Sequence, residues 1–127
     1  MELFIEKYES AVKALMTLEE ALNADYSLFI QDASIQRFEY TTEAVWKCLQ
    51  LYLKEYEGIL CASPKACFRE AKKVKLLDDD AANLALEMID DRNLTSHTYH
   101  EEVAQMLYKH LPQYALLMKN ILSKISI

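Results

Sequence analysis

Residues 28–57 have the sequence LFIQDASIQRFEYTTEAVWKCLQLYLKEYE, and the fold of the chain can be predicted outward from them. Apolar or partly apolar side chains recur at alternating spacings of three and four: Ile35, Phe38, Thr42, Val45, Leu49, Tyr52 and Tyr56. This period is typical of one face of an α-helix. Gly58, the only glycine of the chain, follows directly, where a helix C-cap favours a residue that tolerates a positive φ. The segment is therefore predicted to be one long amphipathic helix.

Residues 3–22 repeat the same alternation with Phe4, Tyr8, Ala11, Leu15, Leu18 and Leu22. The run Asn23-Ala24-Asp25 is expected to end this first helix. Two long helices joined by a short turn form an antiparallel hairpin. Tyr8, Tyr52 and Tyr56 lie on the apolar stripes, so their rings are predicted to be buried with the hydroxyl groups at the rim.

A short basic helix is predicted from Pro64 to about residue 75, with Ser63 as its N-cap. Its cations are Lys65, Arg69, Lys72, Lys73 and Lys75. Two interpretations stay open for this run, an RNA or phosphate patch and an ordinary solvated face. The inward side is expected to consist of Ala66, Cys67, Ala71 and Val74.

Asp78, Asp79 and Asp80 are placed to cap a further helix, whose buried face is predicted to be Leu84, Ala85, Met88 and Ile89. This helix should end near His97, and Thr98-Tyr99-His100-Glu101 has the pattern of a capping box for the next helix. The last helix is predicted to bury Val103, Leu107, Tyr114, Leu117 and Ile121. Pro112 lies inside that pattern and should kink or break it.

The composition supports an all-α protein, because one glycine and two prolines in 127 residues leave few helix breakers. We predict a single domain over residues 1–127, folded as an up-and-down antiparallel four-helix bundle. The short helix is expected to be inserted between the second and third long helices. The aromatic side chains of Phe29, Trp46 and Tyr52 exceed what such a bundle needs to cover, which favours a two-fold homodimer.

Charge and cysteine content narrow the class of protein. The net charge is −6, and residues 1–62 carry all of it, with 5 basic and 11 acidic side chains. An acidic chain is not expected to coat nucleic acid non-specifically, and we expect no DNA binding. Cys48, Cys61 and Cys67 have no paired zinc spacing, so we expect buried or half-buried reduced thiols in a cytoplasmic protein. No signal sequence, no membrane-spanning segment, no metal site and no cofactor are predicted.

The segment Asp90–Glu102 brings three chemically active side chains together. Arg92, His97 and Tyr99 form the pattern R-x4-H-x-Y. A guanidinium can hold a phosphate bidentately, and an imidazole can transfer protons near neutral pH. Asp91, Asn93 and Ser96 are the polar neighbours predicted to support binding.

The pattern alone leaves a structural interpretation open. Arg92 is expected in that case to pair with Asp90, Asp91 or a carbonyl at the helix end, and His100 and His110 are expected to be structural. On an unbroken helix, positions 92 and 97 would lie roughly 140° apart. A helix end near His97, or a dimer that pairs two copies of the pattern, would remove this obstacle.

In the catalytic interpretation, His97 acts as general base on a ribose 2′-hydroxyl group or as general acid toward the leaving oxygen. Arg92 then holds the scissile phosphate and stabilises its developing charge. The residues alone predict a soluble helical bundle with a possible phosphate-handling corner.

Three runs closely resemble the nucleotidyltransferase substrate-binding proteins of the HEPN superfamily: Ser63-Pro64-Lys65 through Arg69-Glu70-Ala71, Leu77-Asp78-Asp79, and Met88 through Tyr99. The second half of the chain resembles this family closely, and the first half resembles it in its helical pattern. Members are small bacterial and archaeal proteins encoded beside a minimal nucleotidyltransferase. The string DRNLTSHTY, residues 91–99, is the most specific part of the likeness.

The resemblance implies roles for individual residues. Arg92 and His97 fall on the R-x4-6-H motif that forms a metal-independent RNase site at the dimer interface of related HEPN toxins. Asn93 falls on the polar position after the arginine. Tyr99 falls on the tyrosine that the cognate nucleotidyltransferase antitoxin adenylylates in the toxin branch, and it should be accessible rather than packed in the core.

Three hypotheses for the function follow from the resemblance. The first is an RNase toxin, a homodimer neutralised by a cognate minimal nucleotidyltransferase, with RNA as substrate. The second is a non-catalytic subunit that binds a nucleotide or other substrate for the transferase. The third is a structural helical partner in which the motif has lost its role.

Overall fold

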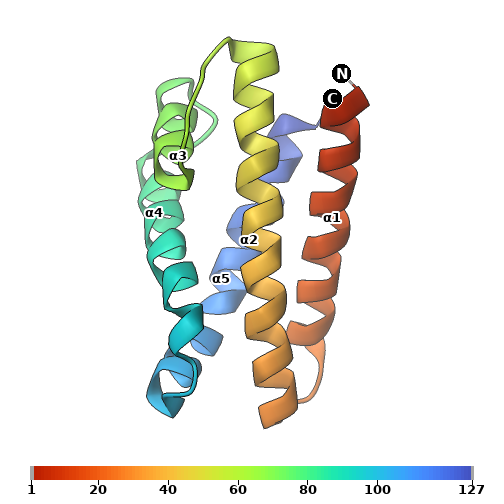
Figure 1. Cartoon of the computed structure of the whole chain (residues 1–127), viewed down its shortest axis with the longest axis vertical. Coiled ribbons are helices and arrows are strands. Elements are labelled where there is room, and N and C mark those ends of the chain that lie inside the picture. Colours follow the sequence, from red (N-terminus) through yellow and green to blue (C-terminus); the bar gives the residue numbers. More distant parts are fainter. Residues whose placement is uncertain (1, 127) are drawn as a thin grey trace.

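The structure, a computed structural model, describes residues 2–126, and every secondary-structure element in that range is a helix. The elements are α1 (Glu2–Asn23), α2 (Leu28–Glu57), α3 (Pro64–Lys73), α4 (Asp79–Asn93), a short 3₁₀ helix η1 (Leu94–His97) and α5 (Glu101–Ile125). Figure 1 shows α1 and α2 as an antiparallel hairpin, with α5 behind α2 and with α3 and α4 along one side. The predicted all-α bundle, with a short helix between the second and third long helices, is confirmed.

Local capping signals explain where the helices begin and end. Ser27, Ser63 and Asp78 precede α2, α3 and α4, and each side chain accepts a hydrogen bond from a first-turn backbone N–H. Gly58 ends α2 with φ of 67°, and its N–H donates to the carbonyl of Leu53. A side chain at that φ would be strained, which is why glycine suits this position.

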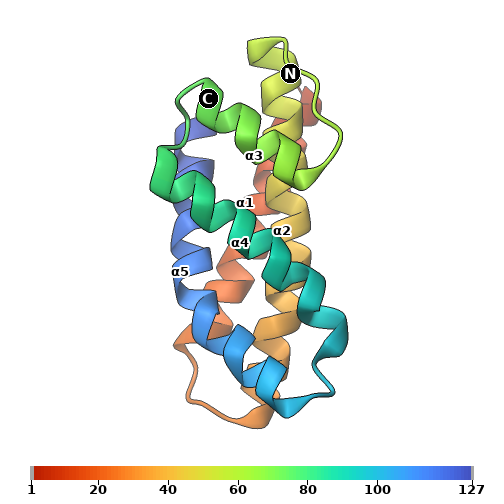
Figure 2. The ribbon, with the colours of Figure 1, turned by 90° about the vertical axis from the view of Figure 1, so that its left-hand side faces the viewer.

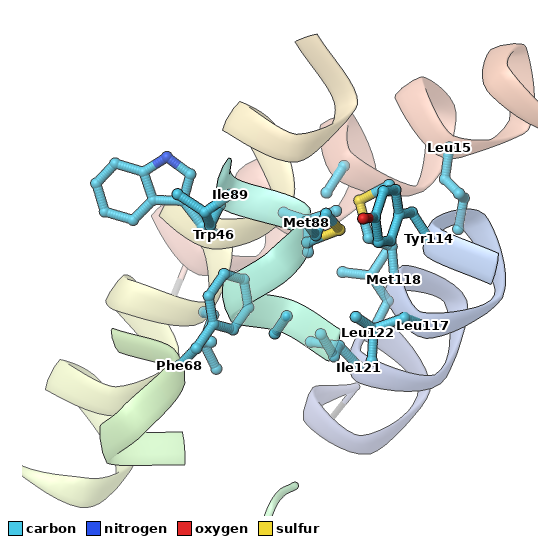
Figure 3. Packing of buried hydrophobic residues seen from close by; sticks show 14 of the residues in the cluster. Leu15, Trp46, Phe68, Met88, Ile89, Tyr114, Leu117, Met118, Ile121 and Leu122 are labelled. Atoms are coloured by element: carbon cyan, nitrogen blue, oxygen red, sulfur yellow. The ribbon is translucent and has the colours of Figure 1, made fainter. Parts of the chain in front are cut away.

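The core lies where α2 meets the other helices, and its largest fully buried side chains include Phe4, Phe38, Phe68 and Tyr114. The rings of Phe38 and Tyr114 stack with centroids 5.6 Å apart. Figure 3 shows Tyr114 beside Met88 and Met118 in the middle of this packing.

The stripe tyrosines are half-buried as predicted, and Tyr8 donates its hydroxyl to the carbonyl of Leu122. Of the three aromatic residues predicted to exceed what the bundle covers, Trp46 was predicted wrongly. Trp46 is only 9% exposed and belongs to the core, because the wide apolar stripe of α2 faces α4 as well as α1 and α5. Phe29 is 89% exposed, and Tyr52 is half-buried.

The junction between α4 and α5 differs from the predicted capping box. α4 continues as η1 to His97, so Thr98 has helical dihedral angles (φ −74°, ψ −3°) instead of the extended ones an N-cap needs. Its hydroxyl donates to the carbonyl of Thr95, and α5 begins only at Glu101 without a side-chain cap from His100. The predicted helix end near His97 is confirmed, but the capping box is wrong.

Pro112 does not break α5, which is continuous from Glu101 to Ile125. The ribbon of α5 changes direction along its length in Figure 2. Proline removes one backbone donor and crowds the preceding turn, and the tight packing of α5 on the bundle outweighs that cost.

The prediction of three reduced cysteines is wrong for two of them. Cys61 and Cys67 form a disulfide with a Cα–Cα distance of 5.3 Å, while Cys48 is free and buried. Cys67 lies in the first turn of α3, so the disulfide links this helix to the segment that precedes its N-cap, Ser63. The predicted cytoplasmic location remains a prediction. Over residues 2–126, no helix is long and apolar enough to cross a membrane.

Candidate functional site

The end of α4 is held from three sides by three consecutive residues. Asp90 accepts a hydrogen bond from Lys65 of α3 at 2.6 Å. Asp91 contacts α5, and Arg92 pairs with Glu43 of α2. Successive residues on an α-helix point about 100° apart, so three neighbours can face three different helices. This fixes the position from which the η1 segment starts.

Arg92 is only partly exposed, at 28% of its side chain, and its Nε lies 3.4 Å from Glu43 Oε1. The contact is an ion pair by distance, although the buried Nε does not have hydrogen-bond geometry. Lys47 pairs with the other oxygen of Glu43 at 3.5 Å. The expected pairing of Arg92 with Asp90, Asp91 or a carbonyl is therefore wrong, because the side chain reaches across to α2.

Asp91 belongs to a partly buried hydrogen-bond cluster. Its Oδ2 lies 2.7 Å from His110 Nδ1 and accepts the hydroxyl of Tyr114 at 2.5 Å. Burial, followed by the hydrogen bond to Asp91 and the charge of that carboxylate, raises the pKa of Tyr114 well above its usual range. Tyr114 therefore stays protonated and donates. Asp91 therefore joins α4 to α5. It was predicted to support binding, and in this position it would do so by holding α4 in place and not by contacting a ligand.

Thr95 anchors η1 to α2. Its side chain is buried, with Oγ1 2.6 Å from Glu39 Oε2 and 2.8 Å from the carbonyl oxygen of Arg92. Glu39 and Glu43, one turn apart on α2, thus contact Thr95 and Arg92, two residues of the R-x4-H stretch. The sequence prediction did not include either glutamate or Thr95, although the i, i+4 spacing of the two carboxylates was a usable signal.

His97 and Tyr99 point away from the bundle. His97 is exposed, Tyr99 is 76% exposed, and His97 Nδ1 lies 3.5 Å from the Tyr99 hydroxyl oxygen. The ring of Tyr99 also packs against His100, with centroids 4.4 Å apart. The predicted accessibility of Tyr99 is confirmed.

Asn93 and Ser96 are exposed, and neither side chain makes a hydrogen bond within the described range. Likewise, no hydrogen bond or ion pair joins Arg92 to His97 within residues 2–126. The structure thus brings His97 and Tyr99 together but leaves Arg92 on the side that faces α2.

The chemistry available at the junction comes from an imidazole, a phenol and a guanidinium. An exposed imidazole can accept or donate a proton near neutral pH, and a guanidinium can bind a phosphate oxygen. In the described part of the chain, no group of three or more His, Cys, Asp or Glu side chains is placed to hold a metal ion.

One family model matches nearly the whole chain. A family model described as "Nucleotidyltransferase substrate binding protein like" matches residues 5–127. A solved protein of Thermus thermophilus is 52% identical, with a TM-score of 0.89 over 92% of this chain and 99% of that one.

Two other solved structures are similar in fold at low identity. A protein from Haemophilus influenzae, described as a substrate-binding domain of a nucleotidyltransferase, is 21% identical with a TM-score of 0.63, over 98% of this chain and 97% of that one. A chain from a toxin–antitoxin structure with AMP-PNP is 13% identical with a TM-score of 0.78, over 99% of each chain. No curated protein sequence matches this chain.

Proposed function

Because the chain belongs to the nucleotidyltransferase substrate-binding protein family, we propose that it is an RNase toxin of the HEPN type, paired with a separate minimal nucleotidyltransferase. Residues 1–127 would form one HEPN-like domain that acts as a homodimer on RNA in the cytoplasm. The observation that supports the proposal most is the exposed pair of His97 and Tyr99, in the segment that follows Arg92. The Nδ1 atom of His97 lies 3.5 Å from the hydroxyl oxygen of Tyr99. This arrangement presents the reactive groups outward while the residues around them are anchored.

The proposed cleavage needs no metal ion. His97 removes the proton from a ribose 2′-hydroxyl group, and the 2′-oxygen attacks the adjacent phosphorus. The bond from phosphorus to the 5′-oxygen breaks, a cyclic phosphate forms, and the leaving oxygen takes up a proton. Arg92 stabilises the charge that develops on the phosphate oxygens. Asn93 and Ser96 are exposed beside it and supply further hydrogen-bonding groups.

The proposal includes the homodimer because one chain does not place Arg92 against His97. A second copy, related by two-fold symmetry, would bring two motifs to a shared groove. Glu43, which pairs with Arg92 at 3.4 Å, would keep the guanidinium in place until a phosphate competes for it.

We further propose that the transferase neutralises the toxin by adenylylating Tyr99. The phenol oxygen forms a bond to the α-phosphorus of ATP, pyrophosphate leaves, and His97 is within reach of the phenol proton. The attached AMP would occupy the groove and bring a phosphate toward Arg92. The toxin–antitoxin structure with AMP-PNP is a precedent for nucleotide binding in a pair with this fold.

The test is expression of the chain with and without its neighbouring transferase, followed by growth and RNA integrity. His97→Ala and Arg92→Ala should each abolish RNA cleavage, since removing a general acid or base lowers rates by about 10²–10⁴. His100→Ala is the matched control, because His100 is also exposed and lies three residues from His97. Helicity and melting temperature should be unchanged in all three. Full toxicity in either motif variant would refute the roles proposed for these residues.

A second candidate is a non-catalytic subunit that binds a nucleotide or substrate for the transferase. It is favoured by the lack of direct contact between Arg92 and His97 in the described chain. In that case, expression alone would leave growth and RNA intact, while the pair would still form a stable complex. Mass spectrometry of the co-expressed pair separates the two, because only the toxin proposal expects an AMP adduct on Tyr99.

A further inference from the structure

A cavity elsewhere on the molecule is linked to the motif through Glu43, which pairs both with Lys47 of the cavity and with Arg92. The cavity has a volume of about 520 Å³, is open to solvent, and is bordered by α1, α2 and the segment that connects α2 to α3. Figure 1 shows this connecting segment at one end of the bundle and the α4–α5 junction at the opposite end. The volume lies within the range of about 300–1,000 Å³ that small-molecule sites usually have.

The cavity collects positive charge in the acidic half of the chain. Lys7 from α1 and Lys47 and Lys54 from α2 line it, and no carboxylate does within the described residues. Residues 1–62 contain only 5 basic side chains against 11 acidic ones, so three of the five lie here. Lys47 pairs with Glu43 at 3.5 Å, whereas Lys7 and Lys54 form no ion pair in the described chain. Two ammonium groups are therefore available to an anion.

The remaining wall is apolar and is held in place. Leu51, Ile59 and Leu60 contribute to it, and Leu60 is 80% exposed. Gln50 donates to the carbonyl of Cys61 at 2.6 Å, and the disulfide then ties Cys61 to α3. A wall fixed at both ends loses little conformational entropy when a ligand binds.

We propose that this cavity binds a small organic phosphate of the nucleoside monophosphate type. The phosphate would lie among Lys7, Lys47 and Lys54, and the apolar part of the ligand would cover Leu51, Ile59 and Leu60. The lysines would bind the negatively charged phosphate of the ligand, and the exposed Leu60 with the half-buried Leu51 and Ile59 would contact its organic group. The proposal does not depend on RNase activity, because the cavity shares no residue with the α4–α5 junction.

The experiment is calorimetric titration of the whole chain with AMP, ribose 5-phosphate, inorganic phosphate and adenosine. AMP should bind more tightly than either inorganic phosphate or adenosine. The double variant Lys7→Ala/Lys54→Ala should weaken AMP binding about tenfold, because the phosphate would lose two cationic partners. A ribose 5-phosphate affinity equal to that of AMP would show that the apolar wall does not contact a nucleobase and would overturn the assignment to a nucleoside monophosphate.

The matched control is Lys13→Ala/Lys109→Ala, which removes the same charge from two exposed lysines outside the cavity. It should change the AMP affinity by less than about twofold, because charges far apart are screened by salt. His97→Ala should leave AMP binding intact, because His97 has no hydrogen bond or ion pair with a residue of the cavity in the described chain. This variant separates the cavity from the proposed RNase site. No AMP binding, equal loss in the control variant, or inorganic phosphate binding as tightly as AMP would overturn the proposal.

Discussion

The Asp91 carboxylate is the polar contact that joins α4 to α5, since it contacts both His110 and Tyr114. Asp91→Ala would leave the Tyr114 hydroxyl buried without a partner. We expect the free energy of unfolding to fall by roughly 2–3 kcal/mol, the range for losing a charged hydrogen-bond acceptor. Urea denaturation measures this change. Asp90→Ala is the control, because Asp90 is 63% exposed and its ion pair with Lys65 should contribute less than about 1 kcal/mol. Equal losses in the two variants would contradict the importance of the cluster.

Tyr114 also predicts how stability depends on pH. Burial and the Asp91 hydrogen bond raise the pKa of Tyr114 in the folded chain, while the unfolded phenol titrates near its ordinary value of about 10. Above pH 10 the unfolded state has lost this proton and the folded state retains it, so folding takes up a proton and stability falls. The contribution is complete below pH 10 and is lost as the pH rises.

Tyr114→Phe removes this titration. Compared with wild type, the slope of unfolding free energy against pH above 10 should be shallower by about 1.4 kcal/mol per pH unit. Denaturation curves between pH 8 and 11 provide the measurement, and the other tyrosines and lysines cancel in the comparison. Parallel curves for the two proteins would show that the phenol is not perturbed.

Individual residues of the motif could be predicted from sequence, but their partners could not. The spacing of Arg92, His97 and Tyr99 identified the reactive groups and the exposed position of Tyr99. It carried no information about which residue of another helix would face Arg92. That partner, Glu43, is 49 positions away in sequence and is set by how α4 packs across α2. Long-range pairings of this kind depend on tertiary geometry.

Helix boundaries were predictable where a local chemical signal fixes them. Ser63 and Asp78 cap helix N-termini with their side chains, and Gly58 ends a helix through its positive φ. These signals are local, so the sequence around them is enough to place the helix ends. The Thr98–Glu101 pattern failed because η1 keeps Thr98 helical through the Thr95 anchor on α2. Local preference was overridden there by a contact with a distant helix.

The disulfide gives a prediction about the connection from α2 to α3. Cys61 and Cys67 are six positions apart, so the closed loop is short and its loss should cost about 2 kcal/mol by chain entropy. Cys61→Ser should lower the melting temperature, and a reductant should lower wild type to a similar value. Burial raises the pKa of the free Cys48 thiol to about 12, so alkylation of the folded protein at pH 8 should label no cysteine before reduction. A melting temperature insensitive to reductant would contradict the disulfide.

The molecule as a whole has two unlike ends. The cavity end carries the exposed Leu60 and the lysines Lys7 and Lys54, which form no ion pair in the described chain, and the junction end carries exposed aromatic side chains. Tyr26, Leu28 and Phe29, at the start of α2, are 59%, 60% and 89% exposed. We call these three residues the junction patch. Gln31 donates to Glu101 at 3.3 Å, which places the start of α2 beside the start of α5. The junction patch therefore shares its end of the bundle with Tyr99.

This shared end gives the last prediction, that the junction patch forms part of the homodimer interface. An exposed phenylalanine is costly in water, and a stable dimer needs about 800 Å² buried on each partner, with aromatic residues near its centre. Phe29→Glu should place two carboxylates across the two-fold axis and shift the protein toward monomer, as measured by sedimentation equilibrium. RNA cleavage should fall in parallel, because the proposed site combines Arg92 and His97 from two copies of the chain. Leu116→Glu, at an equally apolar position of α5 that is 60% exposed, is the control and should remain dimeric. A wild-type chain that is monomeric at micromolar concentration and still cleaves RNA would refute both the interface and its role in the site.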